Sequence, residues 1–163
     1  MQNKDTKKSK IGTFSYQYLA RAKLSYIITM PSIIMMIIPA VIADIFATIY
    51  QIINFSVYKI PKVKRSKYIV IDRHHLSYLN GIEKLFCVFC GYVNGVIQYA
   101  AEIGTRTEEF WCPIKHNQKI GYEHSRYHKY LEYGDSETYH KKRKHIRLAQ
   151  EKELKEEEAK SSL

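Results

Sequence analysis

Apolar residues dominate one continuous stretch of the chain, residues 24–58. Between Lys23 and Lys59 there is no Lys or Arg, and Asp44 is the only charged residue. A helix needs about 20 apolar residues to cross the hydrocarbon core of a bilayer. The stretch therefore predicts a membrane segment. It is longer than one crossing requires and short for two crossings joined by a turn.

Two prolines leave the topology of this segment open. Pro31 and Pro39 each lack a backbone N–H and crowd the preceding helical turn. Either one helix of roughly residues 33–53 crosses the bilayer once, or a Pro-broken helical hairpin enters and leaves on the same side. A third interpretation is a buried helix of a soluble core. Because a charge within a bilayer is costly, Asp44 is expected to face protein or a partner, to be protonated, or to lie near the interface.

The apolar positions after Leu76 follow the period of an amphipathic helix. Asp72 is the predicted N-cap of this helical region, and Gly81 and Gly95 would let another helix approach closely. Residues 68–71 have the composition of a short strand or of an extended lead-in. The helical positions are Leu76, Leu79, Ile82, Phe86, Phe89, Val93, Val96, Ile97, Ala100 and Ile103.

These patterns predict a mostly α-helical protein: a hydrophobic membrane helix or Pro-broken hairpin, followed by a small helical cytosolic domain. Five parts are expected along the chain. They are a basic N-terminal tail with an amphipathic helix (1–23), the membrane segment (24–58), a basic linker (59–67), a helical Cys/His domain (68–133) and a charged, solvated helix or tail (134–163).

The distribution of charge also indicates attachment to a membrane. The net charge is +10, and basic residues flank the apolar stretch on both sides, as expected beside anionic lipid head groups. Nucleic acid is the competing partner for such charge, but this clustering favours the lipid bilayer. A protein partner or a second copy of the chain is a further candidate. The basic linker, by the positive-inside rule, places the downstream domain in the cytoplasm.

The three cysteines and one histidine form a candidate metal site. Cys87 and Cys90 are followed by Cys112 and His116 in a C-x2-C-x21-C-x3-H pattern. Three thiolates and one imidazole suit a tetrahedral Zn²⁺ site. An iron–sulfur cluster is the alternative ligand. A third interpretation is that the cysteines bind nothing and are simply buried in the core. In a reducing cytoplasm such thiols are metal-bound or redox-active more often than disulfide-bonded.

Other chemistry is weakly indicated. Asp72 and His75 have the spacing of a ligand pair, and several carboxylates follow, but the Glu-x-x-His pairs of di-iron helical sites are absent. No phosphate-binding glycine loop, nucleophile elbow or zinc-protease motif occurs, so no catalytic residue is predicted. The carboxylates concerned are Glu83, Glu102, Glu108 and Glu109.

Several motifs together resemble a family of small, uncharacterised bacterial membrane proteins. The resemblance covers roughly residues 39–118. It implies attachment to the bacterial inner membrane and supplies no reaction. The residues that carry it are Ile60-Pro61-Lys62-Val63, Asp72-Arg73-His74-His75-Leu76, Tyr78-Leu79-Asn80, Cys87, Cys90-Gly91-Tyr92, Asn94-Gly95, Arg106-Thr107-Glu108 and Trp111-Cys112-Pro113-Ile114-Lys115-His116.

The sequence thus predicts a membrane-attached protein with a cytosolic, metal-stabilised helical module in a structural or interaction role. The alternative is an iron–sulfur or thiol redox component at the membrane. A basic adaptor for nucleic acid is a weaker third hypothesis.

Overall fold

The computed structural model describes residues 24–161, and the side chains of residues 28–160. The predicted N-terminal tail and its amphipathic helix lie outside the described residues. The described part is mostly helical and contains no named strand, as expected for a mostly α protein. Residues 68–71, with their strand-like composition, are part of a non-helical connection.

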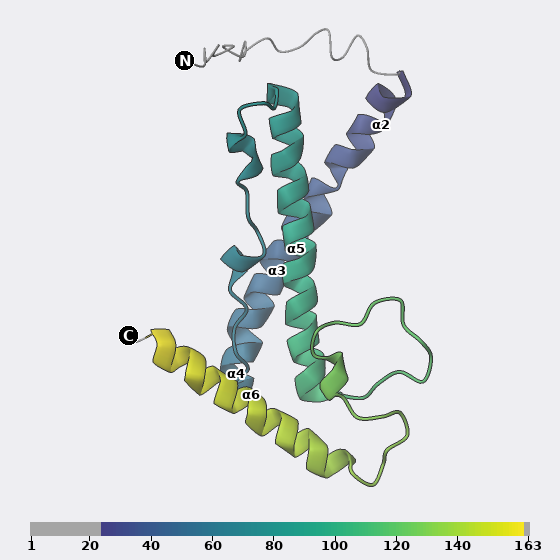
Figure 1. The fold of residues 1–163 in the computed structure, drawn as a ribbon, viewed down its shortest axis with the longest axis vertical. Helices are drawn as coiled ribbons and strands as arrows, with labels where there is room; N and C mark the ends of the chain where they lie inside the picture. Colours follow the sequence, from purple (N-terminus) through teal and green to yellow (C-terminus); the bar gives the residue numbers. More distant parts are fainter. Residues whose placement is uncertain (1–23, 162–163) are drawn as a thin grey trace, which may run out of the picture.

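The apolar stretch forms one helical rod, which we call the apolar rod (residues 24–58). It comprises α2 (Leu24–Met35), α3 (Ile37–Tyr50), a π-helical turn (Gln51–Phe55) and α4 (Ser56–Tyr58). Figure 1 shows α2 and α3 following one another along a single diagonal, so the chain does not fold back at either proline. Pro39 lies in the first turn of α3, where its missing N–H costs least.

A largely non-helical connection, the return segment (residues 59–80), runs back along the molecule from the end of the rod (Figure 1). It contains two short 3₁₀ turns, Arg65–Lys67 and Arg73–His75. Its first part was predicted as a basic linker, yet Ile60 and Val63 are 2% and 4% exposed. The lysines between and beside them are exposed, so this stretch alternates between core and solvent.

The second long helix, α5 (Gly81–Trp111), begins later than predicted. Its N-cap is Asn80 and not Asp72, because the Asn80 side chain accepts from the Glu83 N–H at 2.9 Å while the Glu83 carboxylate accepts from the Asn80 N–H. This reciprocal pair is a capping box. The helix ends at Trp111, because Cys112 precedes a proline and leaves the helical region.

Gly95 does permit a close approach, but of an extended segment and not of a helix. A Cβ built on Gly95 would lie 2.7 Å from the Tyr68 carbonyl oxygen and 2.9 Å from the Ile69 Cα. The return segment therefore packs directly on the backbone of α5. Gly81 meets nothing within 4 Å, so the second predicted approach does not occur there.

The rod and α5 run in the same direction. Asp44 contacts Tyr92, Gln51 contacts Tyr99, and Tyr58 contacts Phe110, so residue numbers rise together on both helices. Such a parallel pair needs the long return segment that connects them. The buried core lies between all three elements and consists of Phe55, Ile60, Val63, Tyr99 and Ile103.

The C-terminal part closes the far end of this pair. Residues 112–138 form a loop with one 3₁₀ turn, Tyr127–Lys129, and an isolated bridge between Ile114 and Leu131. The last helix, α6 (Tyr139–Ser161), then crosses beside the end of the rod, as Figure 1 shows. Its Gln150 is 2% exposed, so the helix predicted as solvated is docked along one side.

Candidate membrane-contacting surface

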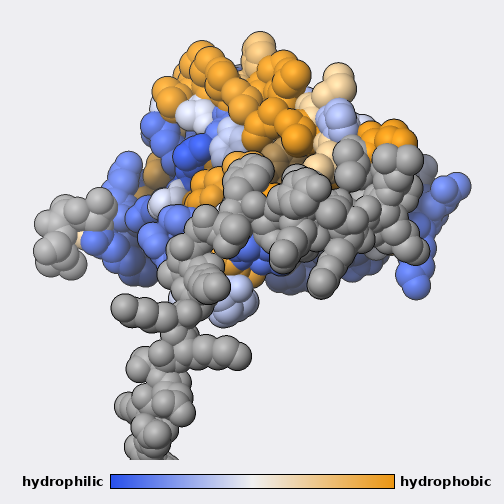
Figure 2. Space-filling model, turned by 90° about the horizontal axis from the view of Figure 1, so that it is seen from above, coloured by the Kyte–Doolittle hydropathy of each residue, from blue (hydrophilic) through white to orange (hydrophobic). Residues whose placement is uncertain are grey.

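The outward face of the apolar rod is an exposed apolar stripe. Among the described side chains of α2, Ile28, Ile33, Ile34 and Met35 are exposed. From α3 onward the exposed apolar residues recur at three- and four-residue intervals and define one face, which we call the outer stripe. Figure 2 shows apolar residues gathered on one side of the molecule. The outer stripe consists of Ile38, Val41, Ile42, Ile45, Phe46, Ile49, Ile52, Ile53 and Val57.

The inward face of the rod carries its one charge. The Arg65 guanidinium donates to both carboxylate oxygens of Asp44, at 3.0 and 2.6 Å. The Tyr92 hydroxyl donates to the same carboxylate at 3.0 Å. Because this bidentate pairing neutralises Asp44 from within the fold, the outer stripe is free of charge along its whole length. Of the alternatives for Asp44, the structure selects a contact with protein.

A second inward polar residue fastens the return segment. Gln51 is 6% exposed. Its amide oxygen accepts from the Val63 N–H at 2.6 Å, and its amide nitrogen donates to the Tyr99 hydroxyl at 2.8 Å. A buried amide without partners would cost about 1–3 kcal/mol. The rod thus places Asp44 and Gln51 against protein and the outer stripe on the outside.

Two stretches of the described residues are long and apolar enough to cross a bilayer, Ile28–Tyr58 and Gly81–Trp111. They run parallel, so if both crossed, the return segment would have to cross as well. That segment exposes Lys62, Lys64 and Lys67. Irregular backbone with exposed charges is not tolerated against hydrocarbon. The arrangement therefore argues against two lipid-embedded crossings.

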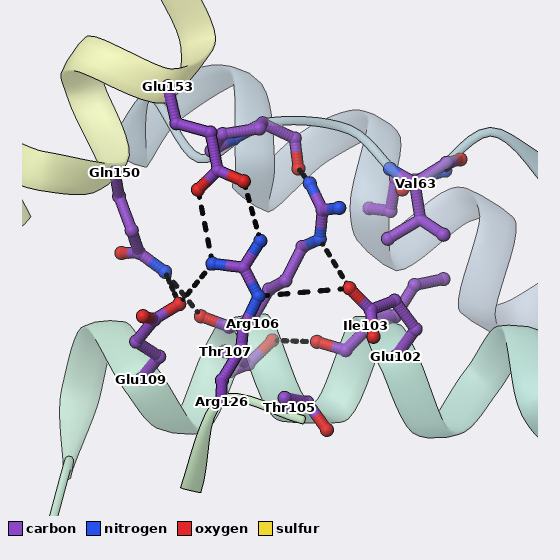
Figure 3. A network of polar contacts seen from close by, with 12 residues as sticks. Val63, Glu102, Ile103, Thr105, Arg106, Thr107, Glu109, Arg126, Gln150 and Glu153 are labelled. Atoms are coloured by element: carbon purple, nitrogen blue, oxygen red, sulfur yellow. Dashed lines mark hydrogen bonds and ion pairs between the residues drawn. The ribbon is translucent and has the colours of Figure 1, made fainter. Parts of the chain in front are cut away.

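The contact between α6 and the end of α5 is held by charge. Arg126 is 8% exposed and lies between two helices. It donates to Glu109 of α5 at 2.6 Å and to Glu153 of α6 at 2.7 Å. Figure 3 shows Gln150 completing the cluster, with its amide 2.9 Å from the Glu109 carboxylate. We call these four residues the arginine cluster.

Burial and pairing compete within this cluster. Burial opposes the charge of Arg126, but its hydrogen bonds to Glu153 and the negative charge of Glu109 outweigh it and raise the Arg126 pKa. For Glu153, burial likewise opposes ionisation, and the hydrogen bond from Arg126 outweighs it and lowers the Glu153 pKa. Both groups are therefore charged at neutral pH, and the cluster ties α6 to α5.

The candidate metal ligands do not meet. Cys87 and Cys90 lie in the first third of α5, whereas Cys112 caps its end, about 33–38 Å further along a helix that rises about 1.5 Å per residue. His116 lies beyond Cys112, where its N–H donates to the Tyr127 hydroxyl. All three cysteines are free, and two of them are exposed. One ion cannot contact all four side chains of one chain in this arrangement.

The alternative metal site, built from histidines and carboxylates, does not form either. Within residues 24–161, no group of three or more His, Cys, Asp or Glu side chains is placed to hold a metal ion. His74 and His75 of the return segment lie against each other, with ring centroids 3.9 Å apart and ring planes tilted by 41°. Glu83 is occupied by the capping box and Glu109 by the arginine cluster.

Sequence reasoning missed the polar contacts that join the elements. A lone carboxylate in an apolar helix requires a cation. Because the linker that follows is basic, a pair between Asp44 and a linker residue such as Arg65 could have been predicted. Arg126 and Gln150 carry no comparable signal, because nothing in a polar loop or a charged helix marks one residue as buried.

Comparison with protein-family models, curated proteins and solved structures gives no match to this chain. The resemblance carried by the motifs above therefore stays a prediction. Any function must be argued from the surfaces and contacts described here.

Proposed function

We propose that this protein attaches to one face of the cytoplasmic membrane through its apolar rod, and that it has a structural or interaction role there. The outer stripe carries the proposal, because nine exposed apolar side chains form one uncharged face. Exposed apolar patches of such extent on a monomer mark membrane or protein contacts. In this arrangement α2 enters deepest and α3 lies along the interface.

The remaining elements face water in this proposal. Lys62 and Lys64 of the return segment and the charged helix α6 are exposed, and they lie at the protein's aqueous side. The positive-inside rule places this side in the cytoplasm. Because α5 contributes one side to the core and lies against the polar return segment, it is held by protein and does not cross the bilayer.

Neither metal nor redox chemistry gains support from the arrangement of α5. Its thiols lie at opposite ends, so the predicted zinc-stabilised module and the iron–sulfur alternative would each need a rearrangement. We therefore propose an anchored module that is stabilised by its helix packing and by the arginine cluster.

The thiols provide the test. In a Cys87→Ser/Cys112→Ser variant only Cys90 remains, and in a Cys87→Ser/Cys90→Ser variant only Cys112 remains. Both are exposed; Cys90 lies in the first third of α5, and Cys112 lies just beyond its end. In sealed vesicles of known orientation, a membrane-impermeant thiol reagent should label both from the cytoplasmic side only.

Opposite-sided labelling of Cys90 and Cys112 would show that α5 crosses the membrane and would overturn the proposal. A third variant without native cysteines but with Ser9→Cys reports the N-terminal side of the rod. Labelling of that position from the outside would mean that the rod crosses once, and would overturn attachment to one face. Failure of the chain to sediment with membranes would overturn attachment itself.

A further inference from the structure

A cationic cleft opens where the apolar rod ends. It has a volume of about 290 Å³ and lies between α4, the end of α5 and the first half of α6. Tyr58 and Phe110 contribute an aromatic wall. The charged residues around it are Lys59, Arg143, Lys144 and Arg147 against a single carboxylate, Glu151, with His140 beside them.

Two guanidinium groups in this cleft have unused hydrogen-bond donors. The Nε of Arg143 and one Nη of Arg147 are buried, and neither donates to any atom of the described residues. Arg147 is held in place, because its Nε donates to the Phe110 carbonyl at 3.0 Å and its guanidinium lies 4.2 Å from the Phe110 ring centre. Buried donors are normally satisfied, so these two call for an acceptor that the described residues do not provide.

The positive charge in the cleft is not balanced by the protein. Burial lowers the pKa of Arg147, and the neighbouring charge of Arg143 lowers it further. Among the described residues that line the cleft, Glu151 is the one acid. It is 3.9 Å from Lys59 and 3.3 Å from Lys155, so it faces two lysines already. An anion in the cleft would relieve this repulsion.

The charges along α6, which lines the cleft, are arranged against the helix dipole. Its first turn has no acidic residue, and basic residues occupy its N-terminal half, where the helix dipole is positive. Its glutamates gather in the C-terminal half, where the dipole is negative. Local rules are broken most often at functional sites, and a bound anion would offset this cost.

We propose that this cleft binds the phosphate group of an anionic phospholipid at the membrane surface. Arginine is suited to phosphate because its planar fork offers paired donors. The cleft is at the lower end of the range of small-molecule sites, about 300–1,000 Å³, so it fits a head group and leaves the acyl chains outside. Val57, the last residue of the outer stripe, lies next to Tyr58 at the cleft, so the acyl chains and the stripe would share one bilayer.

This inference rests on the proposed membrane attachment, and the experiment separates the two. The full chain is titrated with phosphatidylcholine vesicles, either alone or with added phosphatidylglycerol, and binding is followed by flotation. Neutral vesicles report on the outer stripe. The gain in affinity on adding phosphatidylglycerol reports on the cleft.

Three double variants locate that gain. Arg143→Gln/Arg147→Gln removes the guanidiniums, and Lys59→Gln/Lys144→Gln removes two exposed cleft lysines without disturbing the Phe110 contact. The control, Lys141→Gln/Lys142→Gln, changes the same net charge on the same half of α6 outside the cleft. We expect each cleft variant to lose roughly tenfold more of the gain in affinity than the control, since diffuse attraction alone would weaken all three variants about equally.

Equal losses in the cleft and control variants would overturn the cleft while leaving the membrane attachment intact. No binding to either kind of vesicle would overturn both. Inorganic phosphate provides the last arm. If it alone perturbs the fluorescence of Trp111, whose ring is 5.7 Å from Arg147, as strongly as phosphatidylglycerol does, the ligand is a soluble phosphate and the lipid assignment is wrong.

Discussion

Two regions of this molecule, the rod and the docking site of α6, are each fastened by one arginine, but under opposite conditions. In the rod, Arg65 pairs with Asp44 while its own side chain is 48% exposed, and apolar packing around Phe55 and Tyr99 completes the contact. In the arginine cluster, the Arg126 side chain is only 10% exposed; it pairs with Glu109 and Glu153, and more distantly, at 3.8 Å, with Glu102. The rod would therefore hold by packing if its ion pair were lost, whereas α6 depends on its charges.

The largest effect is expected at Arg126. Arg126→Met should leave Glu109, which is 2% exposed, as a buried charge with only Gln150 and distant Lys129 beside it. Breaking a buried pair on one side costs about 3–5 kcal/mol. We expect α6 to detach first, seen as rapid amide hydrogen exchange in α6 while the centre of α5 stays protected.

The double variant Arg126→Met/Glu109→Met is the control, because it removes both charges and should recover most of the protection. If Arg126→Met left exchange in α6 unchanged, the cluster would not be what holds this helix.

An effect of intermediate size is expected at two adjacent residues on opposite faces of the rod. Ile45 is 52% exposed on the outer stripe, and Asp44 is buried. Ile45→Lys should weaken binding to neutral vesicles by about 2–3 kcal/mol, the value of one buried isoleucine, without lowering stability. Asp44→Asn should instead lower the free energy of unfolding by about 2 kcal/mol, as for hydrogen bonds to charged groups, and leave binding unchanged.

Ile97→Lys on α5 is the matched control, since this isoleucine is 55% exposed but lies outside the outer stripe. It should bind vesicles like the parent chain. A loss equal to that of Ile45→Lys would mean that α5 contacts lipid too, and the distinction between the two long helices would disappear.

Sequence patterns predicted the elements that depend on apolar residues. The apolar stretch predicted a helical segment at residues 24–58 but left one helix and a Pro-broken hairpin open. The spacing from Ile82 to Ile103 predicted most of α5, because burial and helical period leave a repeating signal. The contacts between elements left a weaker signal in the sequence. Cys90 and Cys112 looked like ligands of one site, since spacing in sequence does not reveal that an unbroken helix separates them by about 33 Å.

The docking of α6 was hidden for a related reason. Ile146, Leu148 and Leu154 are too few to form an apolar face, so the pattern predicted a solvated helix. The structure uses Gln150 and Glu153 in their place. Specific polar docking depends on partners from distant segments, here Arg126 and Glu109, and no local pattern encodes it.

The smallest predicted effect is a difference in acid sensitivity between the docking of α6 and the packing of the rod. The Glu153 pKa is lowered by Arg126, so its contribution to stability is complete above the ordinary glutamate pKa of about 4.3 and is lost as the pH falls below it. Arg126 stays charged throughout this range. Because Glu153 is 37% exposed, solvent screening limits the effect to roughly 1 kcal/mol. Acid should therefore loosen α6 before the rod separates from α5.

Trp111, the only tryptophan of the chain, can follow this step because Arg147 of α6 lies beside its ring. Fluorescence should change as the pH falls below about 4.3, and Glu153→Gln should weaken the change while far-ultraviolet circular dichroism stays constant. An unaltered transition in Glu153→Gln would assign the acid response to another carboxylate. It would also mean that the partly exposed Glu153 contributes little to holding α6. The buried pair of Arg126 and Glu109 would then be the contact that distinguishes the docking of α6 from the packing of the rod.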